Sequence, residues 1–554
     1  MNCTKCGAEL APESKFCVIC GTPTAQPDVT APVVPAAPVE QAAAPVATAA
    51  PEKEGFKIDV NEVKDQLVST VKPLWDKVKP FLSNKKVLLG IGVVVLVLLI
   101  ASIISVIASG SNGYVQLKQT TLPTTIDGEI HFVVDKKALS DTIEADGVDD
   151  YNTSLDGKVM ALTTDDGVLY VLNGKKLKQV AEDVYDFEIS VSGKGVAYVT
   201  KDEDTYTLSL YNVGSGKSTT ITDELSSMNY VIAPDGKSVA YYVENDDDEA
   251  KLMFSKGKDP VKITSAETDL VGMSNNGTYI YAIRENEEGE SSLYSYDTKG
   301  EGTKLGAIST TSVRFNDDHT QIMFYNEGKT YISTKGKEGV KASSNRLSLI
   351  VAPNASSFYD GNYTYPVSNL YDHVYTATDN DTTSVWLIKK NSDKTVKLVS
   401  KVSNVTLDES AEYLYYIYDG DELRVVKISD GDKATERYVK LADDVDAYIV
   451  TSDRKLVYYY SDSSLYSTNG KKGGRATVVC NDSIEGLAIN AKDVVYYIVD
   501  GDLYATSNGK KGSKVLSDIS GINSTENGIV YAANEDSIYA TDGSKKPSKV
   551  LDRE

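Results

Sequence analysis

The stretch VIAPDGKSVAYYVENDDDEAKLMFSKGKDPVKIT, residues 231–264, decides the fold of the larger part of this chain. A short apolar run leads to a Pro-Asp-Gly turn, and two more strand patterns follow, one through Val239 and Tyr241 and one at Leu252. Alternating apolar and polar residues rich in Val, Ile and Tyr are typical of β-strands. The stretch therefore predicts a unit of short antiparallel strands joined by tight turns.

The same order of strands returns along the chain, so the unit is a repeat. An apolar residue of the third strand recurs about every 41 residues, which is the size of one propeller blade. We therefore expect mainly β structure, with residues 150–554 forming a β-propeller of about eight to ten blades. The recurring residues are Leu169, Leu208, Leu252, Leu293, Tyr331, Val385, Leu423, Leu465, Leu503 and Ile538.

Other arrangements of these repeats are compatible with the pattern. Most propellers have roughly four to eight blades, so some units could share a blade, or two rings could replace one large ring. An open β-solenoid of hairpins is the alternative to a closed ring. Residues 110–149 are expected to connect to the ring, either packing against it or completing it.

Composition restricts the classes of function. The chain has 554 residues and a net charge of −23, and the excess negative charge lies after residue 86. Such a surface repels phosphate backbones, so no nucleic-acid partner is expected. His131, His319 and His373 stand alone and are expected to be ordinary strand or loop residues. With no Gly-x-Ser-x-Gly motif present, we predict that the protein is not an enzyme.

A Cys-rich module occupies residues 1–22. Cys3, Cys6, Cys17 and Cys20 have the spacing C-x2-C-x10-C-x2-C. Each pair can direct two thiolates at one tetrahedral ion, and four protein ligands make the site structural. We predict one Zn²⁺ per chain, which supplies folding energy that so short a module lacks. The alternative, two redox dithiols, is disfavoured by a reducing cytosol and by the lack of a βαβ pattern.

Three segments lie between this module and the repeats. Residues 23–53 are rich in Ala and Pro, which predicts a disordered linker. Residues 54–86 place apolar residues every three or four positions, which predicts a juxtamembrane amphipathic helix, with a plain spacer as the alternative. Residues 87–109 contain no charged residue over 23 positions, which predicts one transmembrane helix.

The lysines around this segment predict its orientation. Six lysines lie between residues 64 and 86, just before the segment, and one follows closely, and positive charge stays on the cytoplasmic side. We therefore expect a single-pass protein of the cell membrane, with a cytoplasmic N-terminus and extracytoplasmic repeats. The lysines are Lys64, Lys72, Lys77, Lys79, Lys85 and Lys86 before the segment and Lys118 after it.

The largest departure from the repeat is an aromatic insert at 350–384. The spacing from Tyr331 to Val385 is 54 residues, some 13 above the mean. Tyrosines interleaved with amide and carboxyl groups can stack on sugars or peptides and bind their polar edges. The alternative is an irregular blade with ordinary strand tyrosines. The candidate ligand-binding residues are Tyr359, Tyr363, Tyr365 and Tyr371.

Asp-rich turns recur at residues 246–248, 379–381, 419–421 and 500–502. Their carboxylate oxygens could bind calcium. However, Asp-Gly and Asn-Asp pairs are also favourable hairpin turns, and no repeat contains a complete calcium-binding loop. We therefore interpret them as hairpin turns.

Two resemblances to known families add to this reading. MNCTKCGAEL and KFCVICGT resemble the zinc ribbon at the N-terminus of many bacterial single-pass membrane proteins. APDGKSVAYY resembles the blades of TolB-like and related extracellular propellers, which implies the fold and no catalytic residue.

The prediction is a non-enzymatic binding or sensing protein with a protein or glycan partner outside. The zinc ribbon would be a cytoplasmic module for a protein partner. A structural cell-envelope protein and a propeller hydrolase are the alternatives.

Overall fold

The computed structural model divides the chain into two compact units, Met1–Val93 and Val94–Glu554. It describes residues 114–553 apart from 116, 204, 245–249, 258, 349, 352–366, 390–394, 471–473, 526 and 545. All of these described residues belong to the second unit. The predicted zinc ribbon, linker, juxtamembrane helix and transmembrane helix (1–109) therefore lie outside the described residues.

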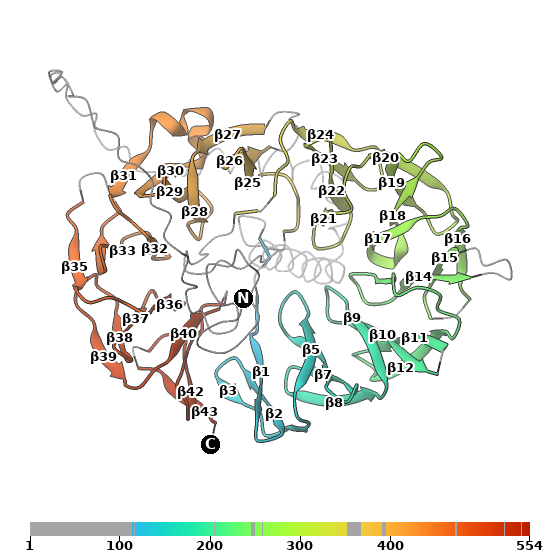
Figure 1. The fold of residues 1–554 in the computed structure, drawn as a ribbon, viewed down its shortest axis with the longest axis horizontal. Coiled ribbons are helices and arrows are strands. Elements are labelled where there is room, and N and C mark those ends of the chain that lie inside the picture. Colours follow the sequence, from blue (N-terminus) through green and yellow to red (C-terminus); the bar gives the residue numbers. More distant parts are fainter. Residues whose placement is uncertain are drawn as a thin grey trace, which may run out of the picture. The chain divides into compact units, whose positions relative to one another are not determined.

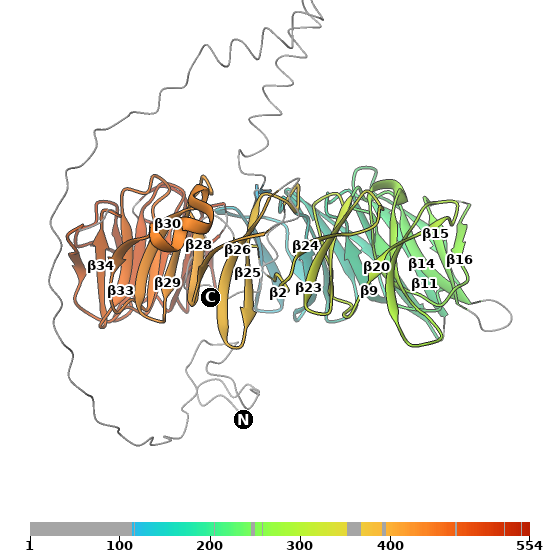
Figure 2. The same ribbon diagram turned by 90° about the horizontal axis from the view of Figure 1, so that it is seen from above.

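The described residues form eleven antiparallel sheets, and the sheets are the blades of one closed ring (Figure 1). Seen edge-on, the blades form a single layer (Figure 2). The prediction of eight to ten blades is wrong, and the ring is closed where an open solenoid was the alternative. The described structure does not match the predicted transmembrane helix either. None of its helices is long and apolar enough to cross a membrane, and residues 87–109 fall outside it.

Blades 1 to 11 follow chain order, and each runs from the central opening outward. Blade 1 is narrower than most because its last two strands both pair with the second strand. The strands of blades 1 to 4 are β1 (Thr121–Ile126), β2 (Glu129–Val134), β3 (Lys137–Ala138) and β4 (Ile143–Glu144); β5 (Val148–Thr153), β6 (Val159–Thr164), β7 (Leu169–Asn173) and β8 (Lys176–Ala181); β9 (Val184–Ile189), β10 (Gly195–Asp202), β11 (Thr205–Asn212) and β12 (Lys217–Thr222); β13 (Val231–Ile232), β14 (Val239–Glu244), β15 (Ala250–Ser255) and β16 (Val261–Thr264).

Blades 5 to 8 include the irregular part of the ring, because blade 7 has only three strands. They also contain two short 3₁₀ segments, η2 (Asn275–Gly277) and η3 (Ile428–Glu436). The strands are β17 (Asp269–Met273), β18 (Ile280–Glu285), β19 (Ser291–Tyr296) and β20 (Gly302–Ala307); β21 (Arg314–Phe315), β22 (Gln321–Asn326), β23 (Lys329–Thr334) and β24 (Val340–Ser343); β25 (His373–Asp379), β26 (Thr382–Ile388) and β27 (Thr395–Ser400); β28 (Val402–Leu407), β29 (Tyr413–Tyr418), β30 (Glu422–Lys427) and β31 (Val439–Ala442).

Blades 9 to 11 have four strands each. Their strands are β32 (Ala447–Val450), β33 (Val457–Ser461), β34 (Ser464–Thr468) and β35 (Thr477–Cys480); β36 (Gly486–Ile489), β37 (Val495–Val499), β38 (Asp502–Thr506) and β39 (Ser513–Leu516); β40 (Gly521–Ser524), β41 (Val530–Ala533), β42 (Ser537–Thr541) and β43 (Ser548–Asp552).

All ten recurring residues lie on the strand next to the outermost strand of a blade, so each marks one blade. In nearly every case a break in the pairing register directly follows the marker, as at Leu252 in blade 4 and Leu503 in blade 10. Such a bulge increases the twist of the strand pair. Blade 1 has no marker because β3 is only two residues long and both are exposed. Residues 110–149 thus contain blade 1, which raises the number of blades from the ten that carry a marker to eleven.

The second strand of each blade is packed between two neighbouring blades, and tyrosines fill many of these positions. Tyr281, Tyr375 and Tyr458 are fully buried. The hydroxyl of Tyr281 in blade 5 donates to the His319 carbonyl oxygen of blade 6 at 3.0 Å. That of Tyr458 in blade 9 accepts from the Gly509 amide of blade 10 at 2.9 Å. Buried tyrosine hydroxyls therefore tie adjacent blades together.

The ring closes by contacts between blades 1 and 11, which belong to separate sheets. Val133 of β2 packs in one apolar cluster with Ile529 and Tyr531 of blade 11. A salt bridge of 2.5 Å joins Lys136 to Asp542. Similar apolar clusters lie between the other neighbouring blades, so the core is distributed around the ring.

The turn between the first and second strands of a blade lies against the corresponding turn of the next blade. The amide of Ser192 in blade 3 donates to the Pro234 carbonyl oxygen in blade 4 at 2.9 Å. In blades 2–5 and 11 these turns contain a glycine with φ between +66° and +75°, and we call them glycine turns. Glycine adopts this conformation without steric cost. The glycines are Gly157, Gly193, Gly236, Gly277 and Gly528.

Blades 6, 9 and 10 place a larger residue at the same turn position. His319, Arg454 and Asp493 have φ between +55° and +59°. Each side chain reaches the preceding blade, and we call the three residues latch residues. His319 Nδ1 lies 3.0 Å from the Met273 carbonyl oxygen, and Arg454 Nε lies 3.5 Å from an oxygen of Asp408. The carboxylate of Asp493 accepts from the amide and the hydroxyl of Ser452, each at 2.7 Å.

A segment that we call the strap, residues 114–120, joins opposite sides of the ring (Figure 1). At one end Tyr114 makes an antiparallel bridge with Val367, beside blade 7. At the other end two successive amides donate to the Asp156 carbonyl oxygen in blade 2, each at 3.0 Å. The contact with blade 2 is close, since a Cβ at Gly157 would lie 1.8 Å from the carbonyl oxygen of residue 119.

Candidate functional site

Blade 7 is the irregular blade, and it contains the aromatic insert. The place of its first strand is taken by a single antiparallel bridge between Ile350 and Tyr375. Val367 makes a second antiparallel bridge, with Tyr114 of the strap. Of the predicted ligand-binding residues, Tyr359, Tyr363 and Tyr365 lie outside the described residues, and Tyr371 lies within them.

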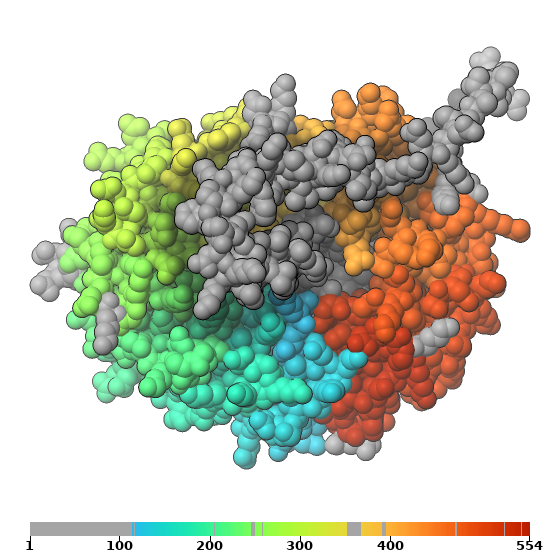
Figure 3. Space-filling model, turned by 180° about the vertical axis from the view of Figure 1, so that it is seen from behind, coloured from blue at the N-terminus to red at the C-terminus, as the bar shows by residue number. Residues whose placement is uncertain are grey.

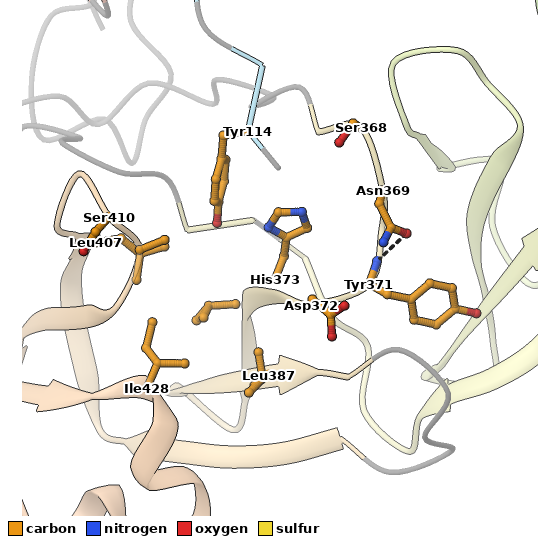
Figure 4. A pocket seen from close by; sticks show the side chains of 12 residues that line it. Tyr114, Ser368, Asn369, Tyr371, Asp372, His373, Leu387, Leu407, Ser410 and Ile428 are labelled. Carbon is orange, nitrogen blue, oxygen red and sulfur yellow. Dashed lines mark hydrogen bonds between the residues drawn. The ribbon is translucent and has the colours of Figure 1, made fainter. Parts of the chain in front are cut away.

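A pocket of about 400 Å³ lies between blade 7 and blade 8 (Figure 4). This volume lies within the roughly 300–1,000 Å³ of ligand sites. Its lining comes from the strap, from the stretch that enters β25, from β26, and from blade 8. We call it the blade 7 pocket. The lining residues are Tyr114, Ser368, Asn369, Tyr371, Asp372, His373, Val374, Leu387, Leu407, Ser410, Ala411 and Ile428.

Two aromatic rings form one wall of this pocket. Tyr114 and His373 pack edge to face, with ring centroids 4.6 Å apart and planes at 72° (Figure 4). The Tyr114 hydroxyl donates to the Val351 carbonyl oxygen at 2.7 Å. Burial lowers the pKa of His373 to about 4, so its ring is uncharged at neutral pH. The wall is therefore aromatic and carries no charge.

The interior is aliphatic and the rim is polar. Leu387 of β26 and Leu407 of β28 are buried, and Ile428 at the start of η3 is partly exposed. Asp372 and Ser410 lie on exposed parts of the lining. Asp372 has φ +63°, and its amide donates to the Ile388 carbonyl oxygen at 2.7 Å, which fixes the entry into β25. Such a pocket can hold an apolar side chain while its rim binds the polar groups around it.

Tyr371 belongs to the lining, but its ring points away from Tyr114 and His373 (Figure 4). It is partly buried and packs against the apolar core around blade 7. Burial raises the pKa of its hydroxyl. The Tyr371 amide donates to Asn369 Oδ1 at 3.1 Å, so this residue contributes mainly to the shape of the turn.

Most residues of this pocket could not be recognised from the sequence. Tyr114, His373 and Leu407 lie far apart along the chain, and only the ring brings them together. Of these three residues, only His373 lies in the segment 350–384, whose unusual length indicated a departure from the repeat. A histidine at the start of an apolar strand inside that anomaly is the one local feature that could have directed attention to the site.

The other predicted residues have structural environments. His131 lies on β2, 3.8 Å from an oxygen of Glu129. His319 stacks on Phe315 with ring centroids 4.4 Å apart, and burial lowers its pKa to about 4. The turns at 419–421 and 500–502 join the second and third strands of blades 8 and 10, and 379–381 does so in blade 7, so all three are hairpin turns. Residues 246–248 lie outside the described residues. Within the described part of the chain, no three His, Cys, Asp or Glu residues are grouped to hold a metal.

The four predicted zinc ligands, Cys3, Cys6, Cys17 and Cys20, lie outside the described residues. A family model described as a zinc-ribbon domain matches residues 2–24. The donor set itself fits zinc, because four thiolates in two C-x2-C pairs suit a tetrahedral ion. The N-terminus therefore has a zinc-ribbon domain, and the match covers that module alone.

No curated protein matches the chain. Similar solved structures include a crystal structure of the eukaryotic initiation factor, at 10% identity and a TM-score of 0.37, covering 66% of this chain and 97% of that one. TolB from Acinetobacter baumannii has 13% identity and a TM-score of 0.24, covering 50% and 77%. A putative TolB from Agrobacterium tumefaciens has 19% identity and a TM-score of 0.26, covering 38% and 83%. The propeller thus has TolB proteins among its structural neighbours, and scores this low support no statement about function.

Proposed function

We propose that the propeller is a non-enzymatic binding platform and that a protein partner docks at the blade 7 pocket. The observation that carries this proposal is one pocket with an aliphatic interior, the uncharged wall of Tyr114 and His373, and a polar rim. An apolar side chain anchored in such a pocket supplies most of the affinity of many peptide interfaces. A peptide is favoured over a glycan because the interior formed by Leu387, Leu407 and Ile428 suits an apolar side chain, and the polar groups of the lining lie at its rim.

The test is site-specific photocrosslinking in cells that express the full-length chain. A benzoylphenylalanine in place of Ser368, at the exposed part of the lining, should crosslink to a protein partner. The substitution Ser410→Trp fills the pocket from an exposed position and should abolish that product. The same probe in place of Lys217, on the outer strand β12, should not give it. A product that persists in Ser410→Trp would rule out the pocket as the docking site.

The zinc-ribbon domain supports a second part of the proposal. We infer one structural Zn²⁺ per chain on Cys3, Cys6, Cys17 and Cys20, in a module that binds a cytoplasmic protein. Metal analysis of the full-length chain under reducing conditions should find one equivalent of zinc. Cys3→Ser should remove it without changing the melting temperature of the propeller, since the linker predicted at 23–53 should uncouple the two.

The location at the cell membrane stays a prediction from the sequence. Cysteine labelling tests it. If the prediction is correct, a reagent outside the cell should react with a cysteine added in the 419–421 turn of blade 8, which is an exposed hairpin. A cysteine added in the 23–53 linker should not react. Labelling of the linker alone would reverse the predicted orientation.

A further inference from the structure

A second hollow, of about 570 Å³, lies between blade 5 and blade 6. Three loops build it: the β18–β19 turn, the connection from β20 to β21, and the β22–β23 turn. In an antiparallel blade, successive connections alternate between the two ends of the sheet. The blade 7 pocket uses connections of the other kind, such as the β28–β29 turn. The two hollows therefore open on opposite ends of the ring.

Neutral polar groups dominate the lining of this hollow. Ser291, Ser309, Thr310, Thr311 and Asn326 supply four hydroxyls and an amide. Buried Ile283 and Ile308, with 5% and 4% of their surface exposed, add an apolar floor.

The charged groups at the hollow are few. Glu327 is paired with Lys329 at 3.0 Å, and Glu290 accepts from Asn286 Nδ2 at 3.1 Å. Lys304 also lies in the lining. With most of these charges already engaged, an uncharged ligand is favoured over a strongly charged one.

Several of the neutral groups have hydrogen-bonding capacity to spare. The side chains of Ser291, Thr311 and Asn326 have no hydrogen-bond partner among the described residues of the propeller. Each can donate and accept. Polar groups that converge on a concave site without protein partners are the groups that fix the orientation of a ligand.

The loops that carry these groups are held in place by both blades. The Ile308 amide donates to the Ser291 carbonyl oxygen at 3.1 Å, within blade 5. The Ser309 amide donates to the Tyr325 carbonyl oxygen at 2.9 Å, and the Glu327 amide donates to Ser309 Oγ at 3.2 Å, both in blade 6. The hollow is thus formed before any ligand arrives, which reduces the entropic cost of binding.

From this geometry we infer that the hollow between blades 5 and 6 is a binding site for a neutral saccharide. Sugar hydroxyls match the free hydroxyl and amide groups, and the C–H face of a sugar ring matches Ile283 and Ile308. The site is independent of the blade 7 pocket, because it shares no residue with it and opens on the other end of the ring.

The experiment is isothermal titration of the full-length chain with three neutral oligosaccharides, maltohexaose, cellohexaose and hexa-N-acetylchitohexaose. At least one should bind, and Thr311→Val and Asn326→Ala should each weaken it by about five-fold or more. Thr220→Val, at an exposed threonine on the outer strand β12, should leave binding unchanged. Melting curves of the variants confirm that they fold.

Two outcomes would overturn the inference. One is that none of the three oligosaccharides binds at millimolar concentration. The other is that binding is the same in Thr311→Val and Asn326→Ala as in the parent chain, which would place the saccharide elsewhere. Neither outcome affects the proposal for the blade 7 pocket, whose crosslinking test uses different residues.

Discussion

Blades 2–5 join their first two strands through glycine turns, whereas blades 6, 9 and 10 use turns with a latch residue. In the first group the neighbouring blade is so close that a Cβ has no room, as at Gly236, where it would lie 2.4 Å from the Gly195 nitrogen. In the second group a side chain occupies the space and bonds to the preceding blade, as Asp493 does with Ser452. One repeat thus holds its blades together either by close backbone contact or by a specific polar bond.

The two kinds of turn differ in their cost. A non-glycine residue in the left-handed region costs on the order of 1–3 kcal/mol. A hydrogen bond to a charged group, such as the two that the Asp493 carboxylate accepts, contributes about 1.5–3 kcal/mol. The hydrogen bonds of a latch residue can therefore offset the strain of its own turn. A glycine turn has no such strain, and it has no space for a side chain.

The largest effect is expected where a glycine turn is filled. Gly236→Ala combines a φ of +69° with the contact to the Gly195 nitrogen, so it should lower the free energy of unfolding by about 3 kcal/mol or more. Gly328→Ala is the matched control, since its φ is +71° and nothing lies within 4 Å of the added Cβ. The control should cost only about 1 kcal/mol in urea unfolding. Equal losses in the two variants would mean that close contact between blades is unimportant.

A smaller effect is expected where a latch is removed. Asp493→Gly loses two hydrogen bonds from Ser452 but relieves the positive φ of 59°, so the net loss should be about 1–2 kcal/mol. The measurement is a double-mutant cycle with Ser452→Ala in urea unfolding, in which the two changes should not add. A neutral or stabilising Asp493→Gly would show that the latch contributes nothing.

The smallest expected effect is on how the stability of the propeller depends on pH. It should have opposite signs in blade 3, which has a glycine turn, and in blade 6, which has a latch residue. In blade 3, burial raises the pKa of Glu188 to about 7, against an ordinary value of 4.5, although its carboxylate accepts from the Ile232 amide at 2.9 Å. The folded state then holds a proton that the unfolded state has lost. This contribution to stability is complete below pH 4.5 and is lost as the pH rises through 7.

In blade 6 the latch residue His319 behaves in the opposite way. Burial lowers its pKa from 6.5 to about 4, so the unfolded state binds the proton first. Its contribution to stability is complete above pH 6.5 and is lost as the pH falls through 4. Melting temperatures measured from pH 4 to 8 should lose the high-pH slope in Glu188→Gln and part of the low-pH slope in His319→Asn. Unchanged profiles in both variants would contradict these assignments.

The repeat could be predicted from the sequence because its signals are local. A Pro-Asp-Gly turn, an alternating strand and the spacing of residues such as Leu252 and Leu503 are each encoded within about 40 residues. The blade count could not, because β3 is too short and too exposed to leave an apolar pattern. The full burial of strand tyrosines such as Tyr281 and Tyr458 could not be predicted either, since the partners of their hydroxyls belong to the next blade.

The candidate sites were less accessible to prediction than the fold. The insert at 350–384 marked the irregular blade through its length alone, and Tyr371 does lie in the pocket lining there. The aromatic wall depends on Tyr114, which comes from a different part of the chain. The hollow between blades 5 and 6 is lined by Ser and Thr residues that are typical of loops. The strap brings Tyr114 to the blade 7 pocket, and the packing of two neighbouring blades brings the second set together.

Figure 3 shows the far side of the ring, with its first and last blades, blue and red, side by side. These two blades meet through side chains rather than through a shared sheet, so a pull on the chain ahead of blade 1 could peel it from the ring. The strap alters how that load is carried. Force applied ahead of Tyr114 meets its bridge to Val367 and the paired bonds to Asp156 before it reaches β1. Tension is thereby divided between opposite sides of the ring, and the joint between blades 1 and 11 is shielded from it.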